Sequence, residues 1–233
     1  MLEEIDKELE KYSNKEKATL LQRFFKTGKG EYGERDVFLG LNVGQQRKIA
    51  KQFKNLHLQD IQKLLDSEIH EKRLIGLLIL VEQFKKGDEK TREKIFNFYL
   101  RNAKKINNWD LVDLSAPNIV GVYLLDRGRD TLYKLVSSDN LWEKRIAILS
   151  TFTFIRNNDF EDTLKISEML LEDKHDLIHK AVGWMLREVG KRDQEKLEDF
   201  LKKHYKKMPR TMLRYSIEKF EESKRQKYLR GEI

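Results

Sequence analysis

A tryptophan and an aspartate stand four residues apart in the segment NNWDLVDLSAP, residues 107–117. Four residues advance a helix by about one turn, so Trp109 and Asp113 would share one helix face. An indole face attracts cations, and a fixed carboxylate can stabilise developing positive charge or orient water. We expect Asp110 to cap the helix that carries them and Pro117 to end it.

A second aromatic residue, Trp184, has Lys180 four residues before it and Arg187 three residues after it. An aromatic ring beside cations on one face suits contact with a phosphate backbone, although a core tryptophan with extended basic neighbours gives the same pattern. Arg145 lies on or beside the apolar stripe of LWEKRIAIL, where a guanidinium requires a phosphate or a buried carboxylate as its partner.

The residues that several other kinds of site require are missing from the sequence. The chain has no cysteine, which excludes disulfides and thiolate nucleophiles, and no G-x-S-x-G turn is present. Gly28 and Gly30 do not complete a phosphate-binding loop. The pair in HDLIH lacks a third ligand and the H-E-x-x-H glutamate, so we expect no metal. Surface or capping positions are expected for the histidines, which are His57, His70, His175, His179 and His204.

The net charge is +8, from 47 basic and 39 acidic residues. Residues 201–233 hold 11 basic and 4 acidic side chains, and so carry most of the surplus. This surplus favours a polyanionic partner such as nucleic acid or an acidic membrane surface; a solvated lysine-rich surface is the alternative. The N-terminus does not resemble a signal peptide and no long apolar run occurs, so a cytoplasmic protein that does not use a membrane is expected.

Apolar residues recur at helical spacing almost throughout, and strand-like alternation is scarce. The glycine-rich stretch at residues 26–41 predicts a loop. Helices are predicted at residues 2–12, 15–25, 44–53, 58–65, 72–84, 91–106, 119–126, 130–136, 141–155, 160–171, 176–190, 194–205 and 210–220.

Three stretches between residues 68 and 205 repeat one pattern, in which a long apolar helix, a short turn and a second amphipathic helix follow one another. They begin near residues 68, 139 and 176. The first interval is about twice the length of one helix-pair repeat, and the second is about one such length. We therefore predict an all-α fold: a single domain, residues 1–233, forming a superhelical solenoid of HEAT-like antiparallel helix pairs. An irregular helical bundle is the alternative.

The sequence resembles the AlkD-type DNA alkylation repair glycosylases, a HEAT-like family. The matching segments cover nearly the whole chain in the family's order: FFKTGKGEYGERDVFLGL, NNWDLVDLSAPNIVG, LWEKRIAILSTFTFIRNNDF, HKAVGWMLREVGKRD and MPRTMLRYSIEKF. The resemblance implies a concave basic groove that holds double-stranded DNA. It also implies base excision repair, by hydrolysis of the N-glycosidic bond of cationic 3- and 7-alkylated purines, without full extrusion of the base.

Matching positions within these motifs imply roles for particular residues. Asp113 takes the role of the catalytic carboxylate, and Trp109 and Trp184 take the role of aromatic walls beside the lesion. Arg145 takes the phosphate-binding role, with Lys144 as the neighbouring alternative. Further DNA contacts are expected from Arg156, Lys180 and Arg187. The resemblance implies no metal and no cofactor, and we expect a monomer in the cytoplasm, associated with the nucleoid.

Two positions depart from the family pattern. Arg35 stands where a glycine is expected, and Gly44 stands where a proline is common. Some relatives have lost glycosylase activity, so the alternative function is a non-catalytic HEAT-like module that recognises nucleic-acid structure.

Overall fold

The computed structural model describes residues 1–233 and is all-helical, apart from one isolated bridge between Val37 and Ile69. The all-α prediction is therefore confirmed. Internal contacts divide the chain into two compact units, Met1–Ser115 and Ala116–Ile233. The units are described separately below, and the single domain, the solenoid and its basic groove stay predictions.

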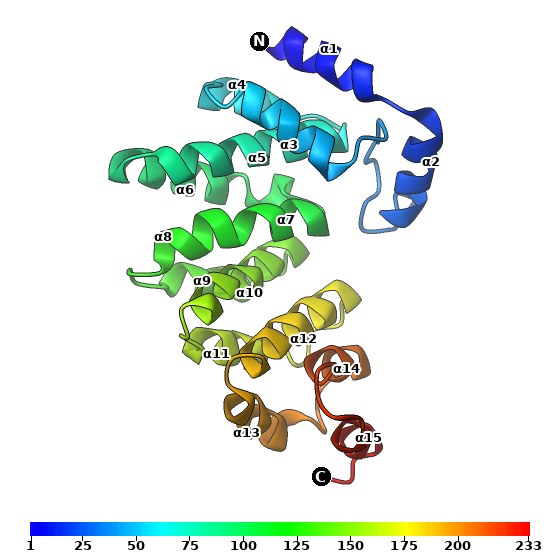
Figure 1. The fold of residues 1–233 in the computed structure, drawn as a ribbon, viewed down its shortest axis with the longest axis vertical. Coiled ribbons are helices and arrows are strands. Elements are labelled where there is room, and N and C mark those ends of the chain that lie inside the picture. Colours follow the sequence, from blue (N-terminus) through cyan, green and yellow to red (C-terminus); the bar gives the residue numbers. More distant parts are fainter. The chain divides into compact units, whose positions relative to one another are not determined.

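Unit 1 consists of helices joined by short turns, with one longer loop between the second and third (Figure 1). The elements are α1 (Leu2–Tyr12), α2 (Lys15–Phe24), α3 (Val43–Gln52), α4 (Leu58–Leu65), α5 (His70–Lys86), α6 (Glu89–Arg101), the 3₁₀ helix η1 (Ala103–Lys105) and α7 (Trp109–Ala116), which reaches the unit boundary.

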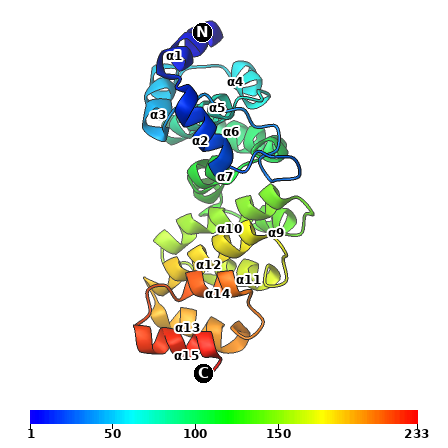
Figure 2. The same cartoon turned by 90° about the vertical axis from the view of Figure 1, so that its right-hand side faces the viewer.

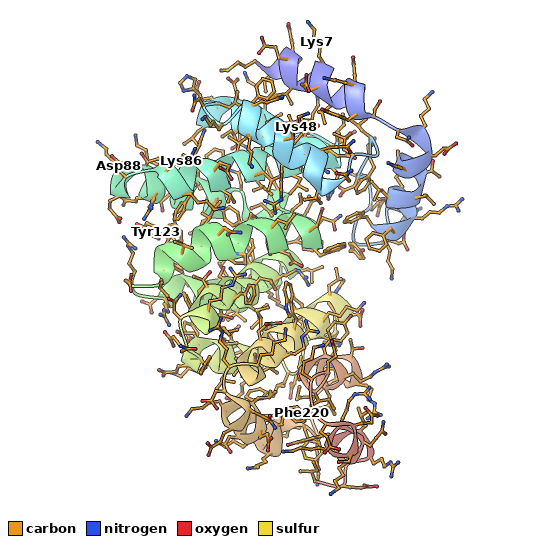
Figure 3. The ribbon with its side chains drawn as sticks, viewed as in Figure 1. Lys7, Lys48, Lys86, Asp88, Tyr123 and Phe220 are labelled. Carbon is orange, nitrogen blue, oxygen red and sulfur yellow. The ribbon has the colours of Figure 1, made fainter.

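Helix α5 forms the core of unit 1. Every residue from position 74 to position 81 is buried, which is expected of a helix that is apolar on all sides. It packs against α3 and α4 and contacts α6. Most of the lysines of this unit lie outside the core, and Figure 3 shows Lys7 of α1, Lys48 of α3 and Lys86 of α5 at its surface.

Unit 2 begins with the π-helical segment η2 (Pro117–Gly121). It continues with α8 (Val122–Leu124), α9 (Asp130–Val136), α10 (Leu141–Arg156), α11 (Glu161–Met169), α12 (Asp176–Gly190), α13 (Gln194–His204), α14 (Arg210–Ser216) and α15 (Glu222–Arg230). Helix α12 packs between α10 and α14, as Figure 2 shows, while α11 contacts α10 and α13 contacts α12. None of the helices in the chain is both long enough and apolar enough to cross a bilayer.

Two glycines allow helices of unit 2 to approach closely. A Cβ at Gly183 of α12 would lie 2.5 Å from Tyr215 Cβ and 2.6 Å from the Met212 carbonyl oxygen in α14. A Cβ at Gly121 of η2 would lie 2.4 Å from the Ser150 carbonyl oxygen in α10. The absence of a side chain at these positions sets the spacing of the helices, and Gly183 thereby sets the position of its neighbour, Trp184.

The predicted helices and the loop after α2 are confirmed, with four main differences. The helix predicted at residues 91–106 ends at Arg101, and the separate 3₁₀ helix η1 follows it. The regular α-helix α7 ends at Ala116, immediately before Pro117 as predicted, but the chain continues as a π-helical turn, which accommodates the proline because that residue lacks an N–H. Helix α14 ends at Ser216, short of residue 220. Helix α15 was not predicted, because it buries only Tyr228 and therefore has no apolar repeat.

Candidate functional site

Trp109 begins α7, and Asp113 lies one turn further along the same helix, as the spacing predicts. Both side chains are half-buried. The Trp109 backbone N–H donates to Asn108 Oδ1 at 2.8 Å, which satisfies one of the free donors of the helix start. Burial and the nearby charge of Asp113 raise the pKa of Tyr99, whose hydroxyl bonds Ser115 Oγ at 2.8 Å. The Asp113 carboxylate therefore lies close enough to this tyrosine to influence its ionisation.

The indole of Trp109 belongs to a row of stacked rings in unit 1. Phe25 stacks on Trp109 with centroids 5.0 Å apart and an interplanar angle of 11°. Phe38 stacks on Phe25 at 4.9 Å, and the imidazole of His70 stacks on Phe38 at 4.5 Å. The exposed ring of Phe24 meets Trp109 edge-on at 5.9 Å. Protein therefore covers one face of the indole, and its tilt is set by Phe25.

Four charged side chains are buried together at the end of this row. His70 Nε2 lies 2.9 Å from Asp110 Oδ2, and His70 Nδ1 lies 3.1 Å from Asp36 Oδ2. Arg73 Nη2 lies 2.6 Å from Asp36 Oδ1. Each of the four is at most 6% exposed. This buried quartet, Asp36, His70, Arg73 and Asp110, joins the loop, α5 and the first turn of α7.

Both histidine nitrogens face carboxylates, which accept hydrogen bonds and donate none when ionised. The ring must therefore carry both protons to satisfy both partners. Burial lowers the pKa of His70, but the Asp110 and Asp36 carboxylates outweigh it and raise the pKa to about 9. Burial raises the pKa of Asp36, but hydrogen bonds from His70 and Asn108 and the nearby charge of Arg73 hold that pKa below its usual value.

The loop at residues 26–41 is held against α5 by a second buried carboxylate. Glu71 accepts the backbone N–H groups of Leu39, Gly40 and Leu41 at 2.9 to 3.3 Å. Gly40 has φ +93°, a conformation that favours glycine, and a Cβ there would lie 2.3 Å from the Asn14 carbonyl oxygen. The loop that presents Phe38 and Asp36 is thus fixed by backbone contacts.

Trp184 lies half-buried on α12 in unit 2. Its indole N–H donates to Glu188 Oε1 at 3.2 Å, and its ring lies 5.7 Å from that of Phe152 in α10, inclined by 51°. The guanidinium of the exposed Arg156 stacks on the same Phe152 ring, with its Cζ 4.1 Å from the ring centroid. Arg156, Phe152 and Trp184 therefore form a cation and aromatic row across two packed helices.

The other basic residues expected to contact DNA are also in unit 2, and acidic or carbonyl groups bond them. Lys144 pairs with Asp173 at 2.8 Å and Lys180 with Asp176 at 2.7 Å, while Arg187 pairs with Glu218. Arg145 is 4% exposed, and its Nη1 donates to the Leu177 carbonyl oxygen at 2.6 Å. Their roles toward DNA stay predictions.

The histidines differ in their surroundings. His175 caps α12, with Nδ1 accepting the Leu177 N–H at 3.1 Å, and His57 stands at the start of α4. The expectation of a surface or capping position is wrong for His70, which is 1% exposed because two carboxylates hold it in the core. Asp110 bonds the Leu111 N–H as well as His70, so capping describes only part of its contacts.

The family model described as DNA alkylation repair enzyme matches residues 5–220. The chain belongs to the DNA alkylation repair enzyme family. A solved structure titled "Predicted DNA alkylation repair enzyme from Enterococcus faecalis" is similar with a TM-score of 0.68 at 14% identity, over 89% of this chain and 96% of that one. It shares the fold of this repair-family chain. No curated protein matches the chain.

The two departures from the repair-family pattern have visible consequences. Arg35 has φ +73°, a left-handed conformation that costs a residue with a Cβ about 1–2 kcal/mol and that glycine adopts freely. Gly44 lies in the first turn of α3, where proline is tolerated because the N–H has no partner within the helix. The backbone at each position would therefore also suit the residue that the sequence analysis expected there, glycine at position 35 and proline at position 44.

Sequence reasoning missed the residues that hold Trp109, namely Phe25, Phe38, Asp36, His70 and Arg73. They come from the loop and from α5, so no local spacing relates them to α7. One signal was available, because the aromatic and acidic residues of FFKTGKGEYGERDVF are unusual in an otherwise glycine-rich and basic loop.

Proposed function

We propose that the chain is a DNA glycosylase that hydrolyses the N-glycosidic bond of cationic 3- and 7-alkylated purines in double-stranded DNA, as a step of base excision repair. Family membership supports a role in DNA alkylation repair. The observation that carries the finer assignment is the arrangement of Asp113 one turn after Trp109 on α7, with both side chains half-buried.

The chemistry of the lesion matches these two groups. An alkylated purine that carries a positive charge leaves as a neutral base when its N-glycosidic bond breaks and takes the bonding electrons. Positive charge then develops on the deoxyribose, and a water molecule attacks C1′ and releases a proton. A fixed carboxylate stabilises that charge and can orient the water. An indole face favours a charged base by about 0.5–2 kcal/mol per contact.

Base release tests the assignment directly. Duplex DNA treated with a methylating agent is incubated with the protein, and released 3-methyladenine and 7-methylguanine are quantified by liquid chromatography with mass spectrometry. We expect Asp113→Asn, which keeps the shape and removes the charge, to lower the release rate at least about 100-fold. Asp126→Asn alters an exposed carboxylate and serves as the matched control.

Two outcomes would overturn the proposal at different levels. Undiminished release by Asp113→Asn would remove the carboxylate role and leave the enzyme. No release by the unaltered protein, together with salt-dependent binding to undamaged duplex, would instead establish the non-catalytic module.

A further inference from the structure

The buried quartet of unit 1 meets α7 at its first turn, immediately before the Trp109 and Asp113 pair. Asp110 is the residue that follows Trp109, and its carboxylate is bonded by His70 Nε2 at 2.9 Å. Asn108, the residue before Trp109, donates its amide to Asp36 Oδ2 at 3.1 Å. The residues on both sides of Trp109 are thus held by groups that His70 bridges.

A second path connects the same histidine to the indole itself. The imidazole stacks on Phe38, Phe38 stacks on Phe25, and Phe25 lies parallel to Trp109. His70 therefore reaches Trp109 through hydrogen bonds to the backbone segment that carries it and through stacked rings that set its tilt.

The geometry points to His70 as a positioning residue, which fixes the first turn of α7 and the indole of Trp109 by clamping Asp36 and Asp110. Its effect on catalysis rests on the proposed glycosylase function, while its effect on Trp109 does not. No contact with DNA is assigned to His70, because it is 1% exposed and both ring nitrogens are engaged within the protein.

The charges of the quartet explain why a histidine suits this position. Two carboxylates, Asp36 on the loop and Asp110 on α7, face the ring, and Arg73 of α5 is the second cation of the group, in an ion pair with Asp36. A protonated ring makes the buried group neutral in sum and satisfies one oxygen of each carboxylate. A glutamine at position 70 has one amide nitrogen and cannot donate in two opposite directions, so one carboxylate would lose its partner.

The first measurement concerns Trp109 and requires no activity. Labelling with 5-fluorotryptophan gives one ¹⁹F resonance for each of the three tryptophans, and loss of a resonance in Trp109→Phe assigns that residue. We expect His70→Gln to shift or broaden the Trp109 resonance and to leave those of Trp142 and Trp184 unchanged. His57→Gln, at the exposed start of α4, is the matched control and should move none of them.

The second measurement concerns base release. We expect His70→Gln to lower kcat about 10-fold to 100-fold, the range expected when a reacting group is displaced by about an ångström. Because the altered group lies inside the protein, affinity for undamaged duplex DNA should stay within about twofold of the unaltered protein. His57→Gln should retain both values.

A third variant covers the case in which His70→Gln does not fold. Asp110→Asn keeps an acceptor for His70 Nε2 and removes one charge, so the imidazole should lose its second proton at lower pH. In the unaltered protein we expect kcat to fall as pH rises through about 9, as His70 loses its charge. In Asp110→Asn this alkaline limb should move to lower pH, and ¹H–¹⁵N correlation spectra of the imidazole should show the same shift.

The outcomes separate the two proposals. A Trp109 resonance that does not move in a folded His70→Gln variant would overturn the positioning role, whether or not base is released. An imidazole titration that does not shift in Asp110→Asn would overturn the charge pairing of His70 with Asp110 on which that role depends. A His70→Gln variant that is less stable but keeps the kcat of the unaltered protein would overturn it as well. A displaced Trp109 resonance in a protein that releases no base would retain the positioning role and reject the glycosylase.

Discussion

At the scale of single residues, Phe24 and Phe25 show how one peptide bond separates a surface side chain from a structural one. Phe24 is 63% exposed, and Phe25 is 6% exposed because it stacks between Phe38 and Trp109. The sequence pair FF gives no indication of which ring is buried. Only the loop that follows decides it, because the loop brings Phe38 over one of the two rings.

Substitution of these neighbours should have very different effects on stability. We expect Phe25→Ala to lower the free energy of unfolding by about 3 kcal/mol, since it removes a buried ring and leaves a cavity in the stack. Phe24→Ala is the matched control and should change it by less than about 0.5 kcal/mol. Urea denaturation followed by circular dichroism measures both changes. Equal losses of unfolding free energy in the two variants would show that stacking between Phe38 and Trp109 does not make Phe25 more stabilising than Phe24.

His70 should also make stability depend on pH. Its pKa is raised from 6.5 to about 9 in the folded protein, so its contribution is fully present below about pH 6.5 and is lost as pH rises through about 9. We expect the urea midpoint of the unaltered protein to fall between pH 7 and pH 9.5. The fall should be smaller in Asp110→Asn, and a fall of the same size in both proteins would contradict this assignment.

At the scale of helices, the close approach of α12 to α14 explains why glycine stands at position 183, in the interior of a helix where a better helix former would be expected. Gly183 of α12 faces the backbone of α14, and a methyl group would overlap the Met212 carbonyl oxygen at 2.6 Å. The backbone at that contact cannot rotate away as a side chain can. The spacing between α12 and α14 thus depends on this one position.

We therefore expect Gly183→Ala to destabilise the protein by about 1–3 kcal/mol, although alanine is the better helix former. Gly128→Ala is the control, because a Cβ there has no neighbour within 4 Å. Thermal unfolding measures the difference, and the ¹⁹F resonance of a labelled Trp184 should move in Gly183→Ala alone. If Gly183→Ala raised the melting temperature, the close contact between α12 and α14 at this position would not be needed for stability.

Helix α15 and the π-helical turn show where local patterns mislead. The segment ESKRQKYLR buries only Tyr228, which packs on Tyr205 and Phe220, so its helix depends on tertiary contacts. Figure 3 shows Phe220 among the side chains of unit 2. Pro117 would end a regular α-helix, but a wider turn stabilised by the Thr153 hydroxyl, which donates to the Pro117 carbonyl oxygen at 2.6 Å, continues it.

At the scale of the whole molecule, the two units have the same net charge, although in unit 2 the surplus lies in residues 201–233. Met1–Ser115 contains 23 basic and 19 acidic residues, and Ala116–Ile233 contains 24 and 20, so each unit has a net charge of +4. Many of the basic side chains in unit 2 pair with carboxylates. Binding to DNA should therefore depend on particular cations more than on the total charge.

Arg156 is the residue at which this expectation can be tested. It is exposed and stacks on Phe152, so its guanidinium is accessible. We expect Arg156→Ala to reduce the slope of log affinity against log salt concentration by about 1, in fluorescence anisotropy with duplex DNA. Lys86→Ala, at the exposed end of α5, is the matched control, and equal slopes for the two variants would contradict a contact at Arg156.

The sequence by itself determined the helical class, most helix positions and the one-turn spacing of Trp109 and Asp113, because these depend on residues close together in the chain. The tertiary structure alone decided that His70 is buried and charged, that Phe25 covers the indole, and that Gly183 must lack a side chain. Each depends on contacts between residues more than 25 positions apart, such as Asp36 with His70 and Phe25 with Trp109. Local periodicity carries no information about such pairs, since they form only when the helices pack.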